Sequence, residues 1–136
     1  MRLEKELRAS INALLHPTIH RQSMTGAAMT CNGVPDFYYD GSKADLWVEY
    51  KLLKGIPRDG IVRGEYTALQ LRWMERRYRV GKNMVGIVGL PNRTAVIQAT
   101  PLEWGEGSPI VNAMTLKEVA CWIESFVGNL RSQVYR

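Results

Sequence analysis

The stretch from residue 35 to residue 52, PDFYYDGSKADLWVEYKL, decides the fold of this chain. Residues 40–43 (DGSK) are typical of a hairpin turn. The apolar and aromatic residues on either side predict two strands, at about residues 34–39 and 44–53. We therefore expect a β-hairpin that brings Asp36 towards the second strand.

The second strand of this hairpin has two different faces. Strand side chains change face with a period of two, so Trp47, Glu49 and Lys51 share one face. The opposite face is apolar and carries Leu46, Val48, Tyr50 and Leu52. A carboxylate and an ammonium group thus lie side by side near the core, where ionised groups are costly unless they are paired.

Asp36, Glu49 and Lys51 form the candidate site. Two carboxylates converging beside a lysine suit a hard divalent cation and a polarised water. Each residue also has a structural interpretation. Asp36 could cap its own turn, Glu49 could lie on a solvated face, and Lys51 could simply be the salt-bridge partner of Glu49.

The remaining elements predict a single α/β domain over residues 1–136 with a central mixed sheet flanked by helices, in the order αββαββα. Helices are expected at about residues 2–15, 67–80 and 116–133, and further strands at 83–90 and 94–100. Gly81 is expected to cap the second helix. Residues 16–33 are expected to form a loop that could contain one short strand, and residues 103–109 are expected to form a second loop. The longer stretch 94–109 is a candidate insertion that shapes a substrate groove.

Composition indicates an intracellular protein, expected in the cytoplasm, with a polyanionic partner. The chain has 136 residues, a formal net charge of +5, no apolar run long enough for a membrane span and no secretory signal. Cys31 and Cys121 suggest reduced thiols rather than a disulfide framework. His16 and His20 have zinc-like spacing, but Pro17 between them disfavours a regular helix and hence a zinc site.

Several short motifs together resemble the PD-(D/E)XK nuclease superfamily. They are residues 33–36 (GVPD), residues 47–51 (WVEYK), residues 67–70 (TALQ), Trp73 and Gly81. Their order and spacing are most similar to the small VRR-NUC nucleases and the archaeal-type Holliday junction resolvases, over about residues 1–90. The length is similar to that of stand-alone, phage-like nucleases of this superfamily, which would place the protein in a host cytoplasm.

The resemblance implies a metal-dependent DNA endonuclease that hydrolyses phosphodiester bonds with Mg²⁺, for which Mn²⁺ would substitute. Asp36, Glu49 and the backbone carbonyl of Tyr50 would hold the metal, and Lys51 would orient or help to deprotonate the attacking water. A glutamate of the first helix completes the metal shell in related resolvases, and Glu4 matches that pattern better than Glu6.

The helix after the hairpin has two further candidate roles. Gln70 either completes a capping box with Thr67 or, as the resemblance implies, leans over the active centre. Trp73 is expected in the core rather than stacked on a base. The candidate DNA-binding side chains form a basic band, which comprises Arg58, Arg63, Arg72, Arg76, Arg77 and Lys82. Arg79 belongs to the same run of basic residues.

Substrate and assembly follow from the size of the chain. Nothing in 136 residues resembles a sequence-reading module, so a branched DNA such as a Holliday junction or flap is the expected substrate. A four-way junction has two symmetric strands and would call for a homodimer. The last helix could supply the interface or pack on the sheet. The alternatives are a sequence-specific restriction-type endonuclease, a non-catalytic DNA-binding protein with this fold, and an unrelated α/β protein with an accidental ion-pair cluster.

Overall fold

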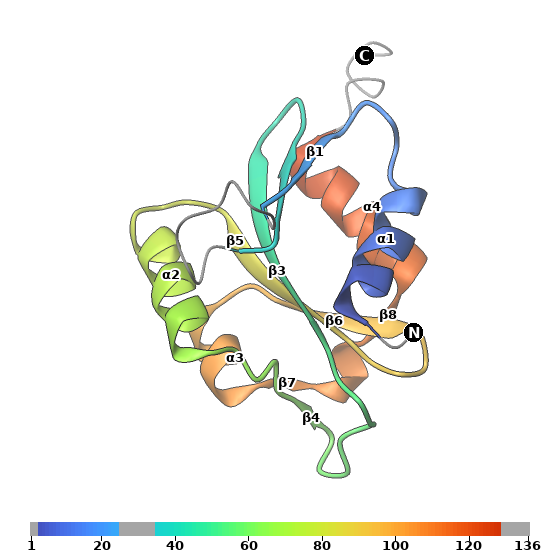
Figure 1. Ribbon diagram of the computed structural model, residues 1–136, viewed down its shortest axis with the longest axis vertical. Helices are drawn as coiled ribbons and strands as arrows, with labels where there is room; N and C mark the ends of the chain where they lie inside the picture. The colour runs from blue at the N-terminus through green and yellow to red at the C-terminus, as the bar shows by residue number, and fades with distance from the viewer. Residues whose placement is uncertain (1–2, 25–34, 129–136) are drawn as a thin grey trace.

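The computed structural model describes residues 3–24 and 35–128. A six-stranded sheet in the order β1-β2-β3-β5-β6-β8 forms its centre (Figure 1). Its strands are β1 (His20–Ser23), β2 (Phe37–Asp40), β3 (Asp45–Leu52), β5 (Met84–Gly89), β6 (Thr94–Gln98) and β8 (Met114–Thr115). β3 and β5 are parallel and the other neighbours are antiparallel, which confirms the expected mixed sheet.

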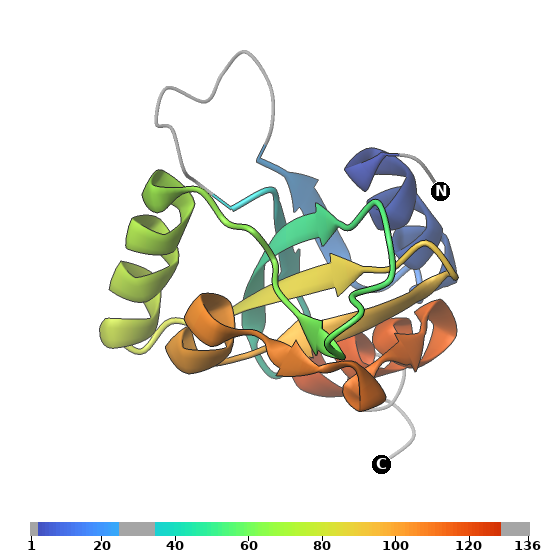
Figure 2. The same ribbon diagram turned by 90° about the horizontal axis from the view of Figure 1, so that it is seen from below.

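Helices cover both faces of the sheet. α1 (Glu4–Leu14) and α4 (Leu116–Val127) lie on one face, and α2 (Ala68–Arg79) and α3 (Pro101–Glu106) lie on the other (Figures 1 and 2). α2 connects the parallel strands β3 and β5. A second small sheet pairs β4 (Ile61–Val62) with β7 (Ser108–Pro109), and a 3-10 turn, Ile110–Asn112, follows β7. Both faces are thus shielded, as an α/β architecture requires.

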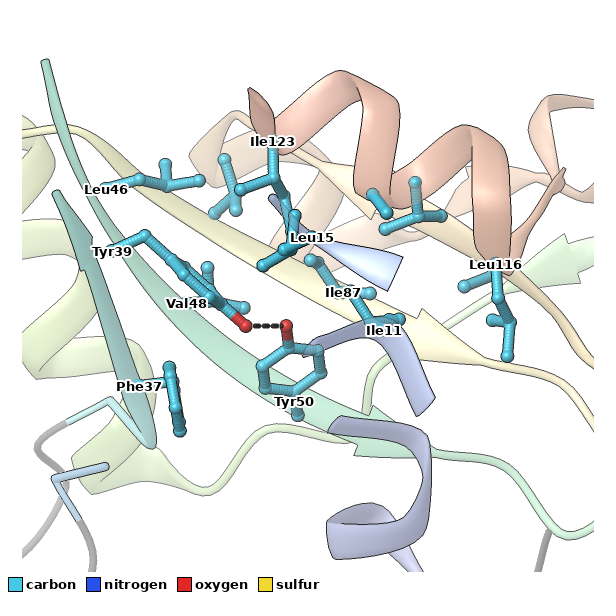
Figure 3. Close-up of a cluster of buried hydrophobic side chains, with 14 of the residues drawn as sticks. Ile11, Leu15, Phe37, Tyr39, Leu46, Val48, Tyr50, Ile87, Leu116 and Ile123 are labelled. Atoms are coloured by element: carbon cyan, nitrogen blue, oxygen red, sulfur yellow. Dashed lines mark hydrogen bonds between the residues drawn. The ribbon is translucent and has the colours of Figure 1, made fainter. Parts of the chain in front are cut away.

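The period-two alternation of β3 is confirmed. Leu46, Val48 and Tyr50 are fully buried in the cluster beneath α1 and α4, whereas Trp47 packs against the cluster beneath α2 and α3. Under the sheet, the hydroxyls of Tyr39 and Tyr50 lie 2.5 Å apart and share a hydrogen bond (Figure 3). The Tyr39 hydroxyl lies 2.6 Å from Oδ1 of Asn12, so the buried phenols are hydrogen-bonded to α1 as well.

The predicted hairpin is present, with β2 paired antiparallel to β3 and a Gly41 N–H to Ala44 carbonyl hydrogen bond of 3.1 Å in the turn. Among the described residues, β2 begins at Phe37, so Asp36 lies immediately before the strand rather than inside it. The turn also touches the end of α4, because the Lys43 N–H donates to the Val127 carbonyl at 2.8 Å.

The stretch 94–109 is part of the fold and not an insertion. β6 lies inside the sheet between β5 and β8, and the expected loop at 103–109 contains most of α3 and all of β7. α3 begins where the Thr100 hydroxyl accepts a hydrogen bond from the Glu103 N–H and proline occupies the first turn. The loop prediction was therefore wrong because it overlooked this capping signal.

The last helix packs on the sheet, as one of the two alternatives for its apolar face expected, and a role for this helix in an interface stays a prediction. Its buried residues are Leu116, Val119, Ala120, Ile123 and Val127. The helix ends at Val127, before Gly128 with φ 85°, and residues 129–133 of the expected helix lie outside the described residues, as does Cys31. Cys121 is free and exposed. Among the described helices, none combines the length and apolar character needed to cross a bilayer.

Candidate functional site

The hairpin brings the carboxyl groups of Asp36 and Glu49 into contact. Phe37 pairs with Val48 in the β2–β3 ladder, so Asp36 reaches the level of Glu49 on the adjoining strand. Oδ2 of Asp36 accepts a hydrogen bond of 3.1 Å from the Tyr50 N–H. The Asp36 carboxyl is also within hydrogen-bond reach of the Glu49 carboxyl. The backbone of β3 thus fixes one acid beside the other.

Glu49 is 1% exposed although it carries a carboxyl group. Burial raises the pKa of Glu49 well above its usual range, and the neighbouring Asp36 raises it further. Within the described part of the chain, Oε1 of Glu49 has no hydrogen-bond partner. A buried oxygen with free lone pairs is rare in proteins and marks a position where a ligand can bind.

Lys51 and Glu4 are also close enough for their charges to act on the carboxyl group of Glu49. Lys51 attracts the carboxylates of both Glu49 and Glu4. Among the described residues, however, no carboxylate oxygen lies within 4.0 Å of the Lys51 ammonium, so the simple salt bridge to Glu49 is not formed. Burial raises the pKa of Glu4, and a hydrogen bond with the backbone of Leu52 opposes this rise. α1 thereby adds a third acid near the site.

This donor set fits a hard divalent cation held largely by water. Carboxylate and carbonyl oxygens are the ligands such ions prefer, and Mg²⁺ is commonly bound through one or two carboxylates while it keeps several waters. In the ranges 3–24 and 35–128, no three His, Cys, Asp or Glu side chains are close enough to hold a metal ion together. Asp36 and Glu49 would thus be the protein's carboxylate ligands, and Glu4 would act through water or by its charge.

Two buried polar residues, Tyr66 and Gln98, lie next to Glu49 on the same face of the sheet. Neither of them was predicted from the sequence as a site residue. In the register, Glu49 faces Gly86 on β5, and Gly86 faces Gln98 on β6. The Tyr66 hydroxyl lies over Gly86 and donates to Oε1 of Gln98 at 2.6 Å. Nε2 of Gln98 donates to the Val62 carbonyl at 3.0 Å. Burial raises the pKa of Tyr66, and the negative charge of Glu49 raises it further. The Tyr66 phenol therefore lies close to the carboxyl group of Glu49.

Gly86 leaves the space that this phenol occupies. A Cβ at Gly86 would overlap the Tyr66 hydroxyl oxygen and lie 2.7 Å from Cζ. We expect Gly86→Ala to lower the free energy of unfolding by about 1–3 kcal/mol, because overpacking forces the ring to move. The measurement is denaturant unfolding. Gly105→Ala is the matched control, because its Cβ would meet nothing within 4 Å. Equal stability of the Gly86 variant and the wild type would contradict the close contact.

Gln70 forms the capping box. Its Oε1 accepts from the Thr67 N–H at 2.9 Å, and its own N–H donates to Oγ1 of Thr67 at 3.1 Å. The side-chain oxygen of Gln70 is therefore engaged at the start of α2. A role for Gln70 over the active centre stays a prediction.

The expected basic band divides into two groups. Arg58, Arg72, Arg76 and Lys82 are exposed, as is Arg79. Arg63 is exposed too, but it pairs with Asp59 at 2.8 Å. Arg77 is partly buried, and its guanidinium lies over the ring of Trp73 at 4.0 Å and over that of Trp47 at 5.1 Å. Trp73 is thus half-buried, in a tilted contact with Trp47, and does not belong to the buried clusters in which it was expected.

Comparison with known proteins supports the fold. The structure is similar to that of Hjc from Archaeoglobus fulgidus, a Holliday junction resolvase from an archaeal hyperthermophile, with a TM-score of 0.55 and 15% sequence identity. The match covers 90% of this chain and 98% of the archaeal chain. No protein-family model and no curated protein matches the sequence. The chain therefore has a resolvase-like α/β fold, and the carboxylate pair lies on its sheet.

Proposed function

We propose that residues 1–136 form a single nuclease domain of the PD-(D/E)XK type that hydrolyses phosphodiester bonds in branched DNA. The observation that carries the proposal is the contact of the buried Glu49 carboxyl with the half-buried Asp36, close to the charge of Lys51. In the described chain this contact leaves Oε1 of Glu49 without a hydrogen-bond partner. A buried carboxyl group beside a second acid destabilises a fold, which makes such a pair a candidate for ligand binding or catalysis. The similarity to a Holliday junction resolvase supports the choice of substrate.

The residues would divide the chemistry among them. Asp36, Glu49 and the Tyr50 carbonyl would hold Mg²⁺, with Mn²⁺ able to replace it. A bound cation of this kind lowers the pKa of a water and stabilises charge on the scissile phosphate. Lys51 would orient the attacking water and add positive charge at the phosphate. Glu4 would help to position the hydrated cation through its place at the start of α1.

Shape rather than base sequence would select the substrate. The exposed basic residues of α2 can contact phosphates, which carry no sequence information. A four-way junction presents two equivalent strands, and a two-fold homodimer would cut both. Such an enzyme acts inside the cell, as the small stand-alone VRR-NUC and phage-type nucleases that the sequence resembles do.

Cleavage assays test the proposal directly. We expect the protein to cut a labelled four-way junction in Mg²⁺ or Mn²⁺, to cut linear duplex of the same sequence much more slowly, and to be inactive in EDTA. Asp36→Asn is expected to bind the junction and leave it intact, because it weakens the carboxylate pair without removing the basic residues. Cutting of linear duplex at one short sequence would indicate a restriction-type enzyme. Binding without cleavage would indicate a non-catalytic protein. That result, or the absence of both binding and cleavage, would overturn the proposed hydrolysis.

A further inference from the structure

A small hollow lies beside the carboxylate pair. It has a volume of about 280 Å³ and is lined by Gln22, Met24, Tyr38, Asp45, Trp47, Arg77 and Lys82. This volume lies just below the range for ligand pockets, about 300–1,000 Å³, and suits one flat ring system better than a larger ligand. The hollow is distinct from Asp36 and Glu49, none of whose atoms line it.

The sheet places this hollow one step along the strands from the carboxylates. Tyr38 pairs with Trp47 across the hairpin, and these aromatic residues lie two positions from Asp36 and Glu49, respectively. A two-residue step along a strand spans about 7 Å and returns to the same face. The hollow therefore lies on the same face as the proposed reaction centre, at a distance comparable to the spacing of neighbouring nucleotides.

Aromatic rings and a planar cation form the wall of the hollow. The ring centroids of Tyr38 and Trp47, which line the hollow, are 4.9 Å apart. Trp73 does not line the hollow, but its ring contacts that of Trp47 at a centroid distance of 5.7 Å. The Arg77 guanidinium lies over both indoles. Planar groups held in this way provide surfaces on which nucleobases stack with little dependence on sequence.

The charges at the hollow also fit a nucleotide. Among the described residues, no carboxylate oxygen lies within 4.0 Å of the side-chain nitrogens of Arg77 or Lys82, so both cations are available to a phosphate. Asp45 lies in the wall, where the Tyr38 hydroxyl donates to its Oδ2 at 3.3 Å. The side chain of Asn83 donates to the Asp45 backbone carbonyl at 2.9 Å and holds the residue in place. The carboxylate can accept a hydrogen bond from an exocyclic amino group, as acids do from cytosine N4.

We propose that this hollow binds an unstacked nucleobase of the DNA, next to the bond that the carboxylates attack. Tyr38, Trp47 and Arg77 stack on the base, and Lys82 contacts its phosphate. Bases at the centre of a junction or flap leave the duplex stack more easily than those inside a duplex, so the hollow favours branched DNA over a closed duplex. Asp45 adds a preference for bases that carry an exocyclic amino group. This inference rests on the proposed nuclease function and names the part of the substrate that the site recognises.

The inference can be tested by measuring how tightly the protein binds junctions in which single bases have been removed, without any measurement of cleavage. Junctions lacking one base at each position around the crossover are titrated with Asp36→Asn protein, which does not cut them. We expect one position where loss of the base weakens binding about tenfold. Adding Arg77→Gln to this protein is expected to weaken binding of the intact junction and to remove the penalty at that position. Arg77→Lys keeps the charge but loses the planar stack, and is expected to remove the penalty as well.

Arg76→Gln is the matched control, because Arg76 is exposed on the same helix and does not line the hollow. This variant should weaken binding of all junctions alike and keep the penalty at the one position. Absence of such a position, or a penalty that survives in both folded Arg77 variants, would overturn the inference while leaving cleavage by the wild type intact. If the wild type cuts nothing but the Arg77-dependent penalty is found, the nuclease proposal fails and the base-binding site stands. Failure of Asp36→Asn protein to bind any junction also overturns the inference.

Discussion

Lys51→Ala is expected to lower the rate of junction cleavage by about 10²–10³-fold while DNA affinity stays nearly unchanged. The reason is that one preorganised positive group at a reacting phosphate contributes an effect of this size to the transition state, whereas binding depends on many phosphate contacts. Lys51 is well placed for this role, because within the described chain it makes no close ion pair that would neutralise it. Single-turnover rates at saturating protein and equal Mg²⁺ measure the effect.

The control for this experiment is Lys117→Ala. Lys117 is exposed on α4, on the opposite side of the sheet, so its removal changes the net charge equally without touching the site. We expect wild-type cleavage from this variant. A Lys51→Ala protein that cleaves at the wild-type rate would rule out a catalytic lysine, and one that binds poorly would show that the residue acts in binding instead.

Glu49→Gln is expected to abolish cleavage and, in the absence of metal, to stabilise the protein. The carboxyl group of Glu49 is buried beside Asp36, and a neutral amide of the same shape can donate a hydrogen bond to that neighbour. The expected gain in the free energy of unfolding at pH 7 is about 1–3 kcal/mol, because the amide is neutral in both states, whereas burial disfavours the ionised carboxylate in the native state. Excess Mg²⁺ or Mn²⁺ should stabilise the wild type and not the variant. Denaturant unfolding with and without metal measures both effects.

The stabilisation by Glu49→Gln should depend on pH in one direction. Burial raises the pKa of Glu49 above its usual 4.5, so the native state holds this proton more tightly than the unfolded state does. The contribution of this proton to the free energy of unfolding is fully present below about pH 4.5, and it is lost as the pH rises through the native pKa of Glu49. Wild type and variant should therefore converge at low pH and diverge as pH rises. Glu75→Gln, at an exposed position on α2, should show no such divergence. A Glu49→Gln protein less stable than wild type at every pH would contradict the argument.

Patterns within short stretches predicted much of this fold. The DGSK turn and the alternating residues of β3 gave the hairpin, and therefore the meeting of Asp36 and Glu49. The capping sequence Thr67-x-x-Gln70 predicted the start of α2, which the structure confirms, and α4 begins at the same kind of sequence, Thr115-x-x-Glu118. These signals are local, because a turn, a cap and a two-residue alternation each depend on neighbouring residues only.

The parts that were missed depend on contacts between distant residues. Tyr66 and Gln98 meet because β3 pairs in parallel with β5 and β6 lies beyond it, an arrangement that no short stretch encodes. The strand glycine Gly86 was the available signal, since a glycine inside a strand often marks a close approach of another group. The two-residue strands β4, β7 and β8 are too short to show any periodicity, so their sequence could not distinguish them from loops.

The Tyr39–Tyr50 hydrogen bond has a consequence for how function and folding are linked. Tyr50 stands between Glu49 and Lys51 in the chain, and its phenol is fastened on the opposite side of the sheet. A slip of β3 by one residue would expose that phenol and turn both charged neighbours into the apolar interior. A conformer misaligned by one residue would therefore lose its core packing and the proposed site together, and we expect it to cleave no DNA.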